Sequence, residues 1–448
     1  MGIEREMRDD LHGIPIILGG GLAGLSAAYH GGGIIYEKES QYGGMCRSPV
    51  VNGYRFDLGI HVLHTRNESI LRLLRKLKLE LVDQSRDAWI YSYEKLTRYP
   101  FQANTFGLPI PIVKECLETF VEAYCKNKAD NEGPVCTNYE EWITAAFGRG
   151  IARHFMIPYS EKFWTVRPSE MTTDWIDVRV PMPNLGEVIE GALTDQDKGF
   201  GPNSLFKYPL DYGIQALPRA FVESGLKIHL DKEAVKIDLE NRKITFSDGE
   251  TNLYSSLIST IPLPELFRLF DAPPGIKAVV DDLRYNSILC VNIGVDREDL
   301  NEKHWIYYPE EKYPFFRISF LRNFSFYLVP ENKSSITAEI AYSKERPIDK
   351  ENISETVIKG LIDAGILARN DYIEFVDLRD LKYGYVIFDH RRRENLDKIK
   401  RFLMNKGIIT AGRYGAWEYQ WMDDAILDGI RAAQESQQFA RNNHVSNG

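Results

Sequence analysis

Three glycines near the start of the chain have a spacing that lets a protein backbone approach phosphate groups. Gly19, Gly21 and Gly24 follow the apolar run 16–18 and lead into the segment 22–29, which is rich in small residues. In this pattern the first glycine permits a tight turn, the second allows close approach to a pyrophosphate, and the third lets a helix pack on a strand. The N–H groups at the start of that helix would bind the phosphate oxygens. We therefore predict that this stretch binds a dinucleotide.

An acidic residue completes the dinucleotide pattern. Glu37 ends a second predicted strand, 34–36, and lies 13 residues beyond Gly24. Its carboxylate can accept hydrogen bonds from the two hydroxyl groups of a ribose. We include Lys38 beside it, and Val235 much further along the chain, as cofactor contacts. The alternative interpretation is a glycine-rich turn in an unrelated α/β domain.

Two further stretches indicate which dinucleotide is bound. Gly43, Gly44 and Arg47 resemble the second fingerprint of the FAD-binding amine oxidase superfamily, in which two glycines and a basic residue follow the acidic strand end. A later stretch with Gly59 and His61 resembles that superfamily's loop at the flavin ring. Rossmann-type NAD enzymes lack this continuation, so the resemblance implies FAD as the cofactor.

The overall composition excludes several classes of protein. The 448 residues carry a formal net charge of −9, which argues against nucleic acid as a partner. Five scattered cysteines without a C-x-x-C pair predict free thiols in a reducing compartment, and neither a disulfide scaffold nor a metal site. The apolar glycine-rich run is interpreted as a buried unit and not as a signal peptide or membrane span. We therefore expect a cytoplasmic protein with no membrane span, and leave open whether it forms a homo-oligomer.

Three segments that are distant in sequence are predicted to form the cofactor domain. The expected fold class is α/β, with a discontinuous Rossmann-type FAD-binding domain, a helical insertion and a mostly antiparallel β-sheet substrate domain. The FAD-binding segments are 1–90, 205–275 and 391–448, the helical substrate-side domain is 91–204, and the antiparallel sheet domain is 276–390.

Hydrophobic periodicity predicts the main elements of these domains. Helices are predicted at 69–79, 113–124, 139–147, 391–406 and 424–440. Strands of the antiparallel sheet are predicted at 288–295, 305–308, 317–320, 324–328 and 336–341, and a hairpin at 235–248 with a turn at Asp248-Gly249. Arg391, Arg392 and Arg393 are interpreted as a solvated helix face and not as a ligand cluster.

A third cofactor element is predicted near the end of the chain. The last predicted strand is followed by Gly412 and Arg413, and then by a helix whose N-terminus would face the cofactor. We expect Arg413 to contact the FAD pyrophosphate or ribityl chain, or the substrate side of the ring. Met422 and Asp423 are further cofactor candidates at the helix start. Asp424 is a natural N-cap, and for both aspartates capping explains the residue as well as cofactor binding does.

Several further motifs are spread across almost the whole chain. They are Tyr99-Pro100-Phe101-Gln102, Pro158-Tyr159-x-x-Lys162-x-Trp164, Trp175-x-x-x-Arg179, Trp305 to Glu310, Pro314 to Arg317, Tyr383-Gly384-Tyr385 and Gly412 to Tyr419. Together they resemble the UDP-galactopyranose mutase family. In that family reduced FAD attacks the anomeric carbon of the sugar through N5, the sugar ring opens and recloses, and no net redox occurs. The resemblance implies a FAD-dependent isomerase of cell-surface glycan biosynthesis, which acts on UDP-galactose or a close relative and is reduced by an external reductant such as NAD(P)H.

The resemblance also implies roles for individual residues. Arg179 and Arg317 would clamp the diphosphate, for which a planar and always-charged guanidinium is well suited. His61 would lie beside the flavin N5, and the role of His64 is left open. The ordinary alternative for each arginine is a salt bridge to one of the 64 acidic residues, and for His61 it is a hydrogen-bonded histidine without a catalytic role.

Aromatic residues would complete the substrate site by the same resemblance. Their alternative is ordinary core packing. The expected phosphate contacts are Tyr307, Tyr385 and Tyr419, the expected base contacts are Tyr99, Phe101 and Gln102, and the remaining substrate contacts are Tyr159 and Trp164.

Two positions depart from the family pattern. Phe324 replaces a tyrosine, so one phosphate contact is expected to be missing, and Ser160 stands where eukaryotic-type members have asparagine. These changes leave the identity of the sugar and nucleotide open. The alternative function is an oxidoreductase of the amine oxidase or protoporphyrinogen oxidase type, in which buried, unpaired Arg179 and Arg317 would be costly. A flavin-binding protein without turnover is a third possibility.

Overall fold

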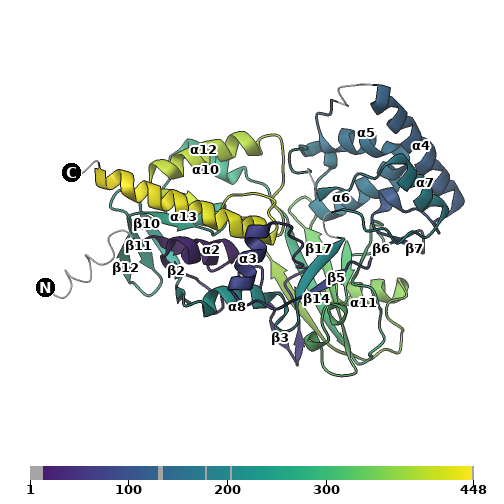
Figure 1. The fold of residues 1–448 in the computed structure, drawn as a ribbon, viewed down its shortest axis with the longest axis horizontal. Helices are drawn as coiled ribbons and strands as arrows, with labels where there is room; N and C mark the ends of the chain where they lie inside the picture. The colour runs from purple at the N-terminus through teal and green to yellow at the C-terminus, as the bar shows by residue number, and fades with distance from the viewer. Residues whose placement is uncertain (1–13, 130–134, 177–178, 202–203, 446–448) are drawn as a thin grey trace.

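The structure, a computed structural model, describes residues 14–129, 135–176, 179–201 and 204–445 (Figure 1). The outer ends of the first and last predicted cofactor segments therefore lie outside the described residues. The chain forms one parallel sheet, one mostly antiparallel sheet and a group of helices beside the second sheet. This arrangement confirms the predicted α/β fold class.

The first sheet is five-stranded and wholly parallel. Its order is β19 (Ile408–Thr410), β13 (Leu257–Ser259), β1 (Ile16–Leu18), β2 (Ile34–Tyr36) and β9 (Lys227–His229). The neighbouring strands β1, β13 and β19 are buried along their whole length, which explains why short apolar runs form them. Helices α2 (Leu22–Gly31) and α13 (Met422–Val445) lie side by side over the sheet (Figure 1). The strands come from three distant segments, as a discontinuous cofactor domain requires.

The second sheet has seven strands. Its order is β18 (Ile373–Leu381), β14 (Ser287–Val295), β17 (Ser334–Tyr342), β16 (Arg317–Ser319), β15 (Trp305–Tyr307), β6 (Ala88–Ser92) and β7 (Lys95–Arg98). All neighbours are antiparallel except β15 and β6, which are parallel. Strands β6 and β7 lie outside the segment 276–390 to which the sequence analysis assigned the sheet.

Two predictions about the strand-rich region are wrong. Residues 324–328 do not form a strand, because Ser325 Oγ accepts a hydrogen bond from the Tyr327 backbone N–H at 3.3 Å and the chain turns. The short 3₁₀ turns Leu321–Asn323 and Phe326–Leu328 occupy this stretch. The hairpin predicted at 235–248 does form, from residues 234–238 and 243–246, but the Asp248-Gly249 turn does not close it and instead joins the second and third strands of the separate sheet that contains the hairpin. That sheet consists of β10 (Ala234–Asp238), β11 (Lys243–Phe246) and β12 (Thr251–Leu253).

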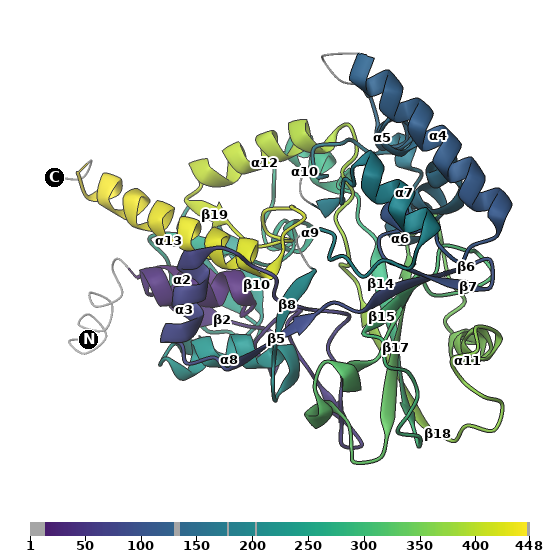
Figure 2. The ribbon, with the colours of Figure 1, turned by 45° about the vertical axis from the view of Figure 1, so that its right-hand side comes forward.

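The helical group lies next to β6 and β7, and a helix missed by the sequence analysis lies on the other flank of the seven-stranded sheet (Figure 2). The group contains α4 (Ile110–Ala129), α5 (Tyr139–Ile151), the π-helical turn Ala152–Met156, α6 (Ile157–Trp164) and α7 (Leu185–Leu193). The missed helix, α11 (Ile353–Asp363), packs through Val357 and Leu361 into a second core formed with the sheet.

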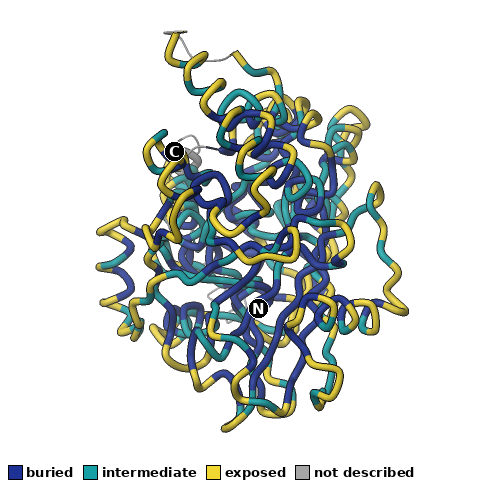
Figure 3. Tube along the Cα trace, turned by 90° about the vertical axis from the view of Figure 1, so that its right-hand side faces the viewer, coloured by how far each residue is buried: buried dark blue, intermediate teal, exposed yellow. Residues whose placement is uncertain are grey.

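Smaller elements connect these layers. They are β3 (Val50–Val51), β4 (Tyr54–Arg55), α3 (Glu68–Lys76), β5 (Leu81–Ser85), the 3₁₀ turns Phe101–Ala103, Pro168–Glu170 and Gly213–Gln215, β8 (Leu205–Pro209), α8 (Ala216–Glu223), α9 (Leu263–Leu266), α10 (Pro274–Asp281) and α12 (Arg392–Asn405). Buried residues run through the centre of the molecule, and exposed residues follow the outer turns (Figure 3). Across the described ranges, no helix has the length and apolarity that crossing a bilayer requires.

Two predictions about helix ends need correction. Arg392 is only 6% exposed, so the three consecutive arginines at the start of α12 are not all on a solvated face. Helix α13 begins at Met422, so Asp424 lies inside its first turn and is not the N-cap. Its carboxylate nevertheless accepts a hydrogen bond from the Trp421 backbone N–H at 2.9 Å, which satisfies a donor at the helix start.

Candidate functional site

The glycine-rich turn has the geometry of a phosphate-binding turn. Gly19 has φ +102°, and a Cβ at Gly24 would lie 2.0 Å from the Gly19 carbonyl oxygen, so the strand and helix approach more closely than any side chain allows. Gly21 is the N-cap of α2 and provides no side-chain cap. The free N–H groups of the first helical turn are therefore available to an anion. The Gly43 N–H donates to the Gly20 carbonyl at 2.8 Å, which brings the second glycine pair, Gly43 and Gly44, against this turn.

Glu37 is fixed at the end of β2. One carboxylate oxygen accepts from the Gly20 N–H at 2.7 Å, and the other accepts from the Glu39 N–H at 2.9 Å. Each oxygen keeps a lone pair, so the carboxylate can still accept from ribose hydroxyls. Lys38 is 62% exposed and lies 3.7 Å from Glu39, so the structure does not bring its ammonium to the turn.

Two other predicted cofactor residues flank this region. The Arg47 side chain donates from Nε to the Gly44 carbonyl at 3.0 Å, and lies 3.9 Å from Glu39. Val235 lies on β10, three residues beyond Lys232, whose N–H donates to the Glu37 carbonyl at 2.9 Å. Both positions therefore lie near the strand end that carries Glu37.

Arg413 is a half-buried residue whose guanidinium has buried atoms without a partner in the described part of the chain. It follows Gly412 after β19, and its Nε and Nη2 atoms have no hydrogen-bond partner among the described residues. Its guanidinium lies 4.6 Å from the ring centre of Tyr385 and 5.1 Å from that of Tyr419. Leaving such donors without an acceptor is costly. The site therefore fits a bound group that presents oxygen or nitrogen acceptors here, as a flavin dinucleotide does.

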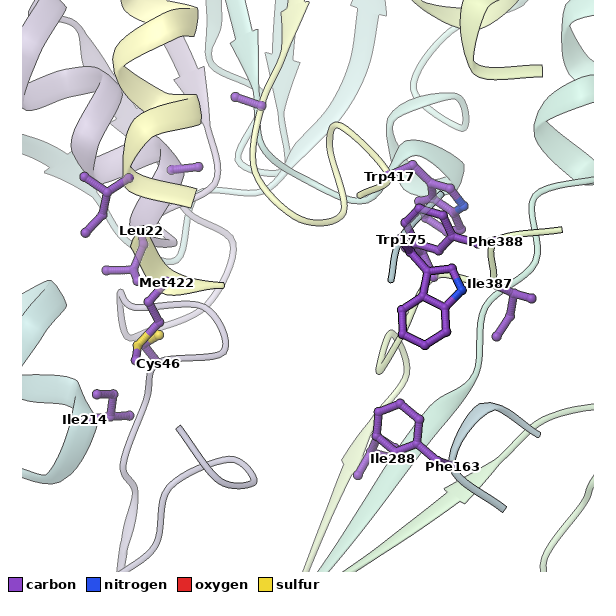
Figure 4. Close-up of a cluster of buried hydrophobic side chains, with 14 of the residues drawn as sticks. Leu22, Cys46, Phe163, Trp175, Ile214, Ile288, Ile387, Phe388, Trp417 and Met422 are labelled. Atoms are coloured by element: carbon purple, nitrogen blue, oxygen red, sulfur yellow. The ribbon is translucent and has the colours of Figure 1, made fainter. Parts of the chain in front are cut away.

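The start of α13 adds apolar and acidic groups to the same region. Met422 is 9% exposed and lies near Leu22 and Cys46 (Figure 4). The Asp423 carboxylate accepts from the Asp424 N–H at 3.1 Å, so it caps the helix locally. Its structural environment therefore supports the capping interpretation.

His61 is close enough to Arg413 and Arg317 for their charges to affect its ring. Its Nδ1 is 3.3 Å from the Gly59 carbonyl oxygen. Burial, together with the positive charges of Arg413 and Arg317, lowers the pKa of His61 to about 4. The imidazole is therefore neutral near pH 7 and can present one N–H donor and one nitrogen acceptor.

A buried carboxylate holds the loop that carries His61. Asp57 accepts hydrogen bonds from Ser48 Oγ at 2.6 Å, from the Tyr208 hydroxyl at 2.5 Å and from the Ile214 N–H at 3.1 Å. Burial raises the pKa of Asp57 to about 6, although these three donors oppose the shift. The loop is thus tied to β8 and to the 3₁₀ turn that follows it.

Arg317 forms an ion pair, which is the ordinary alternative considered for it, with an acid that the sequence analysis did not identify. Arg317 lies on β16, directly opposite Glu339 on β17. Its Nε and Nη2 donate to the two carboxylate oxygens at 2.6 and 2.8 Å. The Arg317 side chain is 13% exposed and that of Glu339 is 4% exposed. The pair fixes the guanidinium plane and leaves the Nη1 group outside the bidentate contact.

Arg179 lies between two aromatic rings. Its guanidinium is 5.1 Å from the ring centre of Tyr419 and 5.0 Å from that of Trp421. Nη2 donates to the Tyr419 carbonyl at 2.6 Å and lies 3.5 Å from Asp424, whereas the buried Nε has no partner among the described residues. The guanidinium is therefore oriented by the protein and still has unused donor capacity.

Aromatic residues connect the three arginines. We call this group the aromatic wall, and it consists of Tyr99, Tyr159, Trp164, Tyr307, Tyr385 and Tyr419. Tyr307 lies 5.0 Å from Tyr99 and 5.5 Å from Tyr159, measured between ring centres. Trp164 lies 5.7 Å from Tyr385 and 5.6 Å from Tyr419. The structure thus brings together predicted residues from five separate parts of the sequence.

The hydroxyl groups of Tyr159 and Tyr385 are held in the protonated form. Burial raises the pKa of Tyr159 and Tyr385 above the ordinary value, and the charge of Arg317 only partly offsets this effect. Tyrosine hydroxyls in this state can donate hydrogen bonds to phosphate oxygens.

Three predicted or questioned residues lie away from the wall surface. Phe101 is fully buried and stacks on Phe155, at 5.0 Å between ring centres. Gln102 is 3% exposed, and its Nε2 donates to the Pro181 carbonyl at 2.9 Å. Ser160 forms a hydrogen bond with Tyr139.

Phe324 belongs to another aromatic group. Its ring lies 5.0 Å from His304, 5.3 Å from Tyr208 and 5.9 Å from Phe206. The Phe324 side chain therefore occupies a buried aromatic cluster that also contacts β8.

Sequence reasoning missed two residues next to the arginines. Glu339 is the one acidic residue in the stretch 334–342, whose other residues are apolar or lack a charge. A single acid in such a strand indicates a buried partner, so this signal could have identified Glu339. Trp421 packs on Arg179 and also lies 4.3 Å from His64, whose two ring nitrogens are buried without a partner among the described residues. No periodicity marks Trp421, because it lies in a loop.

Comparison with known proteins gives a consistent result. The family of flavin-containing amine oxidoreductases matches residues 22–435. The crystal structure of a reduced UDP-galactopyranose mutase is 30% identical, with a TM-score of 0.88 over 94% of this chain and 93% of that one. A fatty acid isomerase from P. acnes is 13% identical with a TM-score of 0.66, over 94% of this chain and 97% of that one. Putrescine oxidase bound to putrescine is 15% identical with a TM-score of 0.65, over 94% of this chain and 98% of that one.

One curated protein matches a shorter stretch. It comes from Methanothermococcus thermolithotrophicus, where it is described as an uncharacterized protein in the nifH2 3′ region. It is 27% identical over 95 residues, which are 20% of this chain and 93% of that protein.

Proposed function

The chain belongs to the family of flavin-containing amine oxidoreductases and uses FAD, and from this premise we propose that it is a nucleotide-sugar mutase. The proposed reaction interconverts the pyranose and furanose forms of UDP-galactose or a close relative. The observation that carries the proposal is the gathering of Arg179, Arg317 and Arg413 around one aromatic wall. The 30% identity to a UDP-galactopyranose mutase over most of both chains supports it.

The electrostatics of the wall favour a diphosphate over an amine. A diphosphate carries two negative charges, and guanidinium groups bind phosphate oxygens with paired donors. An amine substrate is cationic and would be repelled by the same arginines. Arg179 and Arg413 also have buried donor atoms without a partner among the described residues, which an anionic substrate and the cofactor would satisfy.

When bound in its reduced form, FAD supplies a nucleophilic nitrogen for the anomeric carbon without net oxidation. The chain's own residues bind the diphosphate and stabilise the charge that grows on it as the glycosidic bond breaks. Arg179 is proposed to contact the diphosphate through the donors that the Tyr419 carbonyl leaves free. Arg317 is proposed to add its Nη1 edge, whose orientation is fixed by Glu339.

The remaining residues are proposed to orient the substrate and the cofactor. Tyr307, Tyr385 and Tyr419 would donate hydroxyl hydrogen bonds to the phosphates, and Trp164 would limit the space for the sugar. His61, neutral near pH 7, would hydrogen-bond at the cofactor ring without adding charge. Tyr99 is the base contact that we propose, since Phe101 and Gln102 are buried behind it.

One assay tests the function. The purified protein is reduced with dithionite in the absence of oxygen, and UDP-galactofuranose and UDP-galactopyranose are followed by chromatography. Interconversion only after reduction supports the mutase. Oxygen consumption with formation of hydrogen peroxide from an amine, and no interconversion, would instead assign the chain to the oxidases of the family.

A further inference from the structure

The buried arginine at the start of α12 contacts the loop that carries two residues of the site. Arg392 is 6% exposed, although Arg391 and Arg393 on either side of it are exposed. Its guanidinium stacks on the Phe388 ring at 3.8 Å from the ring centre. A desolvated cation needs hydrogen-bond acceptors, and the loop 412–419 supplies them.

Two groups of that loop accept from Arg392. Nε donates to the Trp417 carbonyl at 3.1 Å, and Nη2 donates to the same oxygen. Nη2 also lies 2.5 Å from the Glu418 carboxylate, which has Lys400 as a second cation at 3.8 Å. The planar fork of arginine can hold both acceptors at once, whereas a lysine ammonium cannot reproduce this geometry.

The contacted residue has an unfavourable backbone conformation. Trp417 has φ +58° and is fully buried. A side chain other than glycine in this left-handed region raises the free energy of the backbone, so surrounding contacts must maintain it. The two guanidinium donors on the Trp417 carbonyl are such contacts, and the Glu418 N–H closes the loop on the Arg413 carbonyl at 2.9 Å.

Phe388 connects Arg392 to the segment that leads to Arg179. The Phe388 carbonyl accepts from the Thr172 N–H at 2.7 Å, in the segment that leads to Trp175 and Arg179. Figure 4 shows Phe388, Trp417 and Trp175 close together. Arg392 therefore lies where the segment of Arg179 meets the loop of Arg413 and Tyr419.

We propose that Arg392 is a positioning residue that holds the loop 412–419 in the conformation in which Arg413 and Tyr419 face the site. It contacts neither of their side chains and acts through the Trp417 carbonyl and the Glu418 carboxylate. The consequence for FAD rests on the expected contact of Arg413 with the cofactor, which its Nε and Nη2 atoms, unpaired across the described ranges, favour. The consequence for substrate rests on the proposed function, because it involves Tyr419 and Arg179.

The test compares R392M, R392K and the matched control R393M as holoproteins. We expect R392M to keep its far-ultraviolet circular dichroism, to bind FAD about tenfold more weakly and to change the visible circular dichroism of bound flavin. UDP, used as the probe of the substrate site, should also bind about tenfold more weakly, and R392K should fall between R392M and the wild type. R393M should match the wild type in every readout.

Two results would overturn the proposal. One is an R392M variant whose flavin spectrum, FAD affinity and UDP affinity equal those of R393M. If R392M does not fold, E418Q provides the second test, because it leaves Arg392 in place and removes only the carboxylate. An E418Q variant with wild-type flavin dichroism and FAD affinity would then overturn it. The flavin readouts apply even if the wild type has no mutase activity, so failure of the proposed function and failure of this proposal remain distinguishable.

Discussion

Arg317 and Glu339 lie directly opposite each other on β16 and β17 and are joined by two hydrogen bonds of 2.6 and 2.8 Å. Because the pair is buried, the charge of Arg317 is largely balanced within the protein. The net positive charge of the proposed substrate site therefore comes mainly from Arg179 and Arg413. Glu339 in turn fixes the direction in which Arg317 can bind a phosphate.

Replacing Arg317 should weaken nucleotide-sugar binding while FAD stays bound. In R317A the site loses a charge-assisted contact, and Glu339 is left as an uncompensated negative charge beside the diphosphate. We expect UDP to bind at least about 30-fold more weakly, with the visible flavin spectrum intact. Titration with UDP measures the effect. R322A is the control, because Arg322 also forms an ion pair, with Glu298, away from the wall; wild-type affinity in R317A would remove Arg317 from the site.

Breaking the buried pair should cost more stability than replacing both of its members. Removal of one partner leaves a buried charge, and about 3–5 kcal/mol of unfolding free energy is typically lost. We expect a loss of this size in R317M and a clearly smaller loss in the double variant R317M/E339L. Urea unfolding of the holoprotein measures both. Equal losses in the two variants would mean that the charge of Glu339 is solvated after Arg317 is removed.

Replacing Arg413 should release the cofactor. Its Nε and Nη2 have no acceptor among the described residues, so we expect them to bind FAD through charge-assisted hydrogen bonds worth about 1.5–3 kcal/mol. R413M should therefore bind FAD about 10- to 100-fold more weakly, as measured by the fluorescence of released flavin. R268M is a suitable control, because Arg268 is 65% exposed and pairs with Glu265 on the surface. Unchanged FAD affinity in R413M would indicate a role toward the substrate alone.

The free energy of unfolding should rise with pH because one buried lysine loses its proton in the folded state. Lys162 is 2% exposed and donates from Nζ to the Tyr308 and Glu310 carbonyls, both at 2.9 Å. Burial lowers the pKa of Lys162 to about 7 in the folded protein, whereas its usual value is 10.5. Between these values the unfolded chain holds a proton that the folded chain lacks, so the unfolding free energy increases as pH rises.

The comparison that isolates this effect uses K162M. We expect the difference in unfolding free energy between wild type and K162M to grow from pH 7 to pH 9, by at most about 1.4 kcal/mol per pH unit. K312M is the control, because Lys312 is on the surface, with a side chain that is 49% exposed. A difference that is constant with pH would mean that Lys162 stays protonated in the folded state.

Local spacing made the strand–helix–strand frame of the expected cofactor site predictable. The turn at Gly19, Gly21 and Gly24 and the acid at Glu37 depend on residues close in sequence, and the structure reproduces their strand–helix–strand frame. The seven-stranded sheet was predicted only in part. The strand at 324–328 failed because apolar residues also fill 3₁₀ turns, and periodicity cannot distinguish the two over five residues.

The arginine environments could not be predicted for a different reason. Pairing of Arg317 with Glu339, 22 residues later, depends on the register between β16 and β17. Hydrophobic alternation fixes the face on which a strand residue lies, but without a tight turn it does not fix which residue lies opposite. Arg392 appears among three arginines that pattern analysis places on a solvated helix face, and only the tertiary contact with Trp417 buries one of them. Phe101 and Gln102 were expected at the base, but both are buried by partners distant in sequence: Phe101 stacks on Phe155, and Gln102 donates to the Pro181 carbonyl.

The parallel contact between β6 and β15, and the position of β19 beside β13, have a consequence for synthesis of the protein. Neither sheet can be completed from a contiguous stretch of nascent chain. During translation, β6 cannot pair with β15 until more than 200 further residues have been synthesised. One edge of β13 likewise stays unpaired until residue 410 has emerged from the ribosome. Open strand edges invite pairing with other chains. Slow translation or scarcity of chaperones should therefore lower the yield of native protein more than it would for a fold built from consecutive strands.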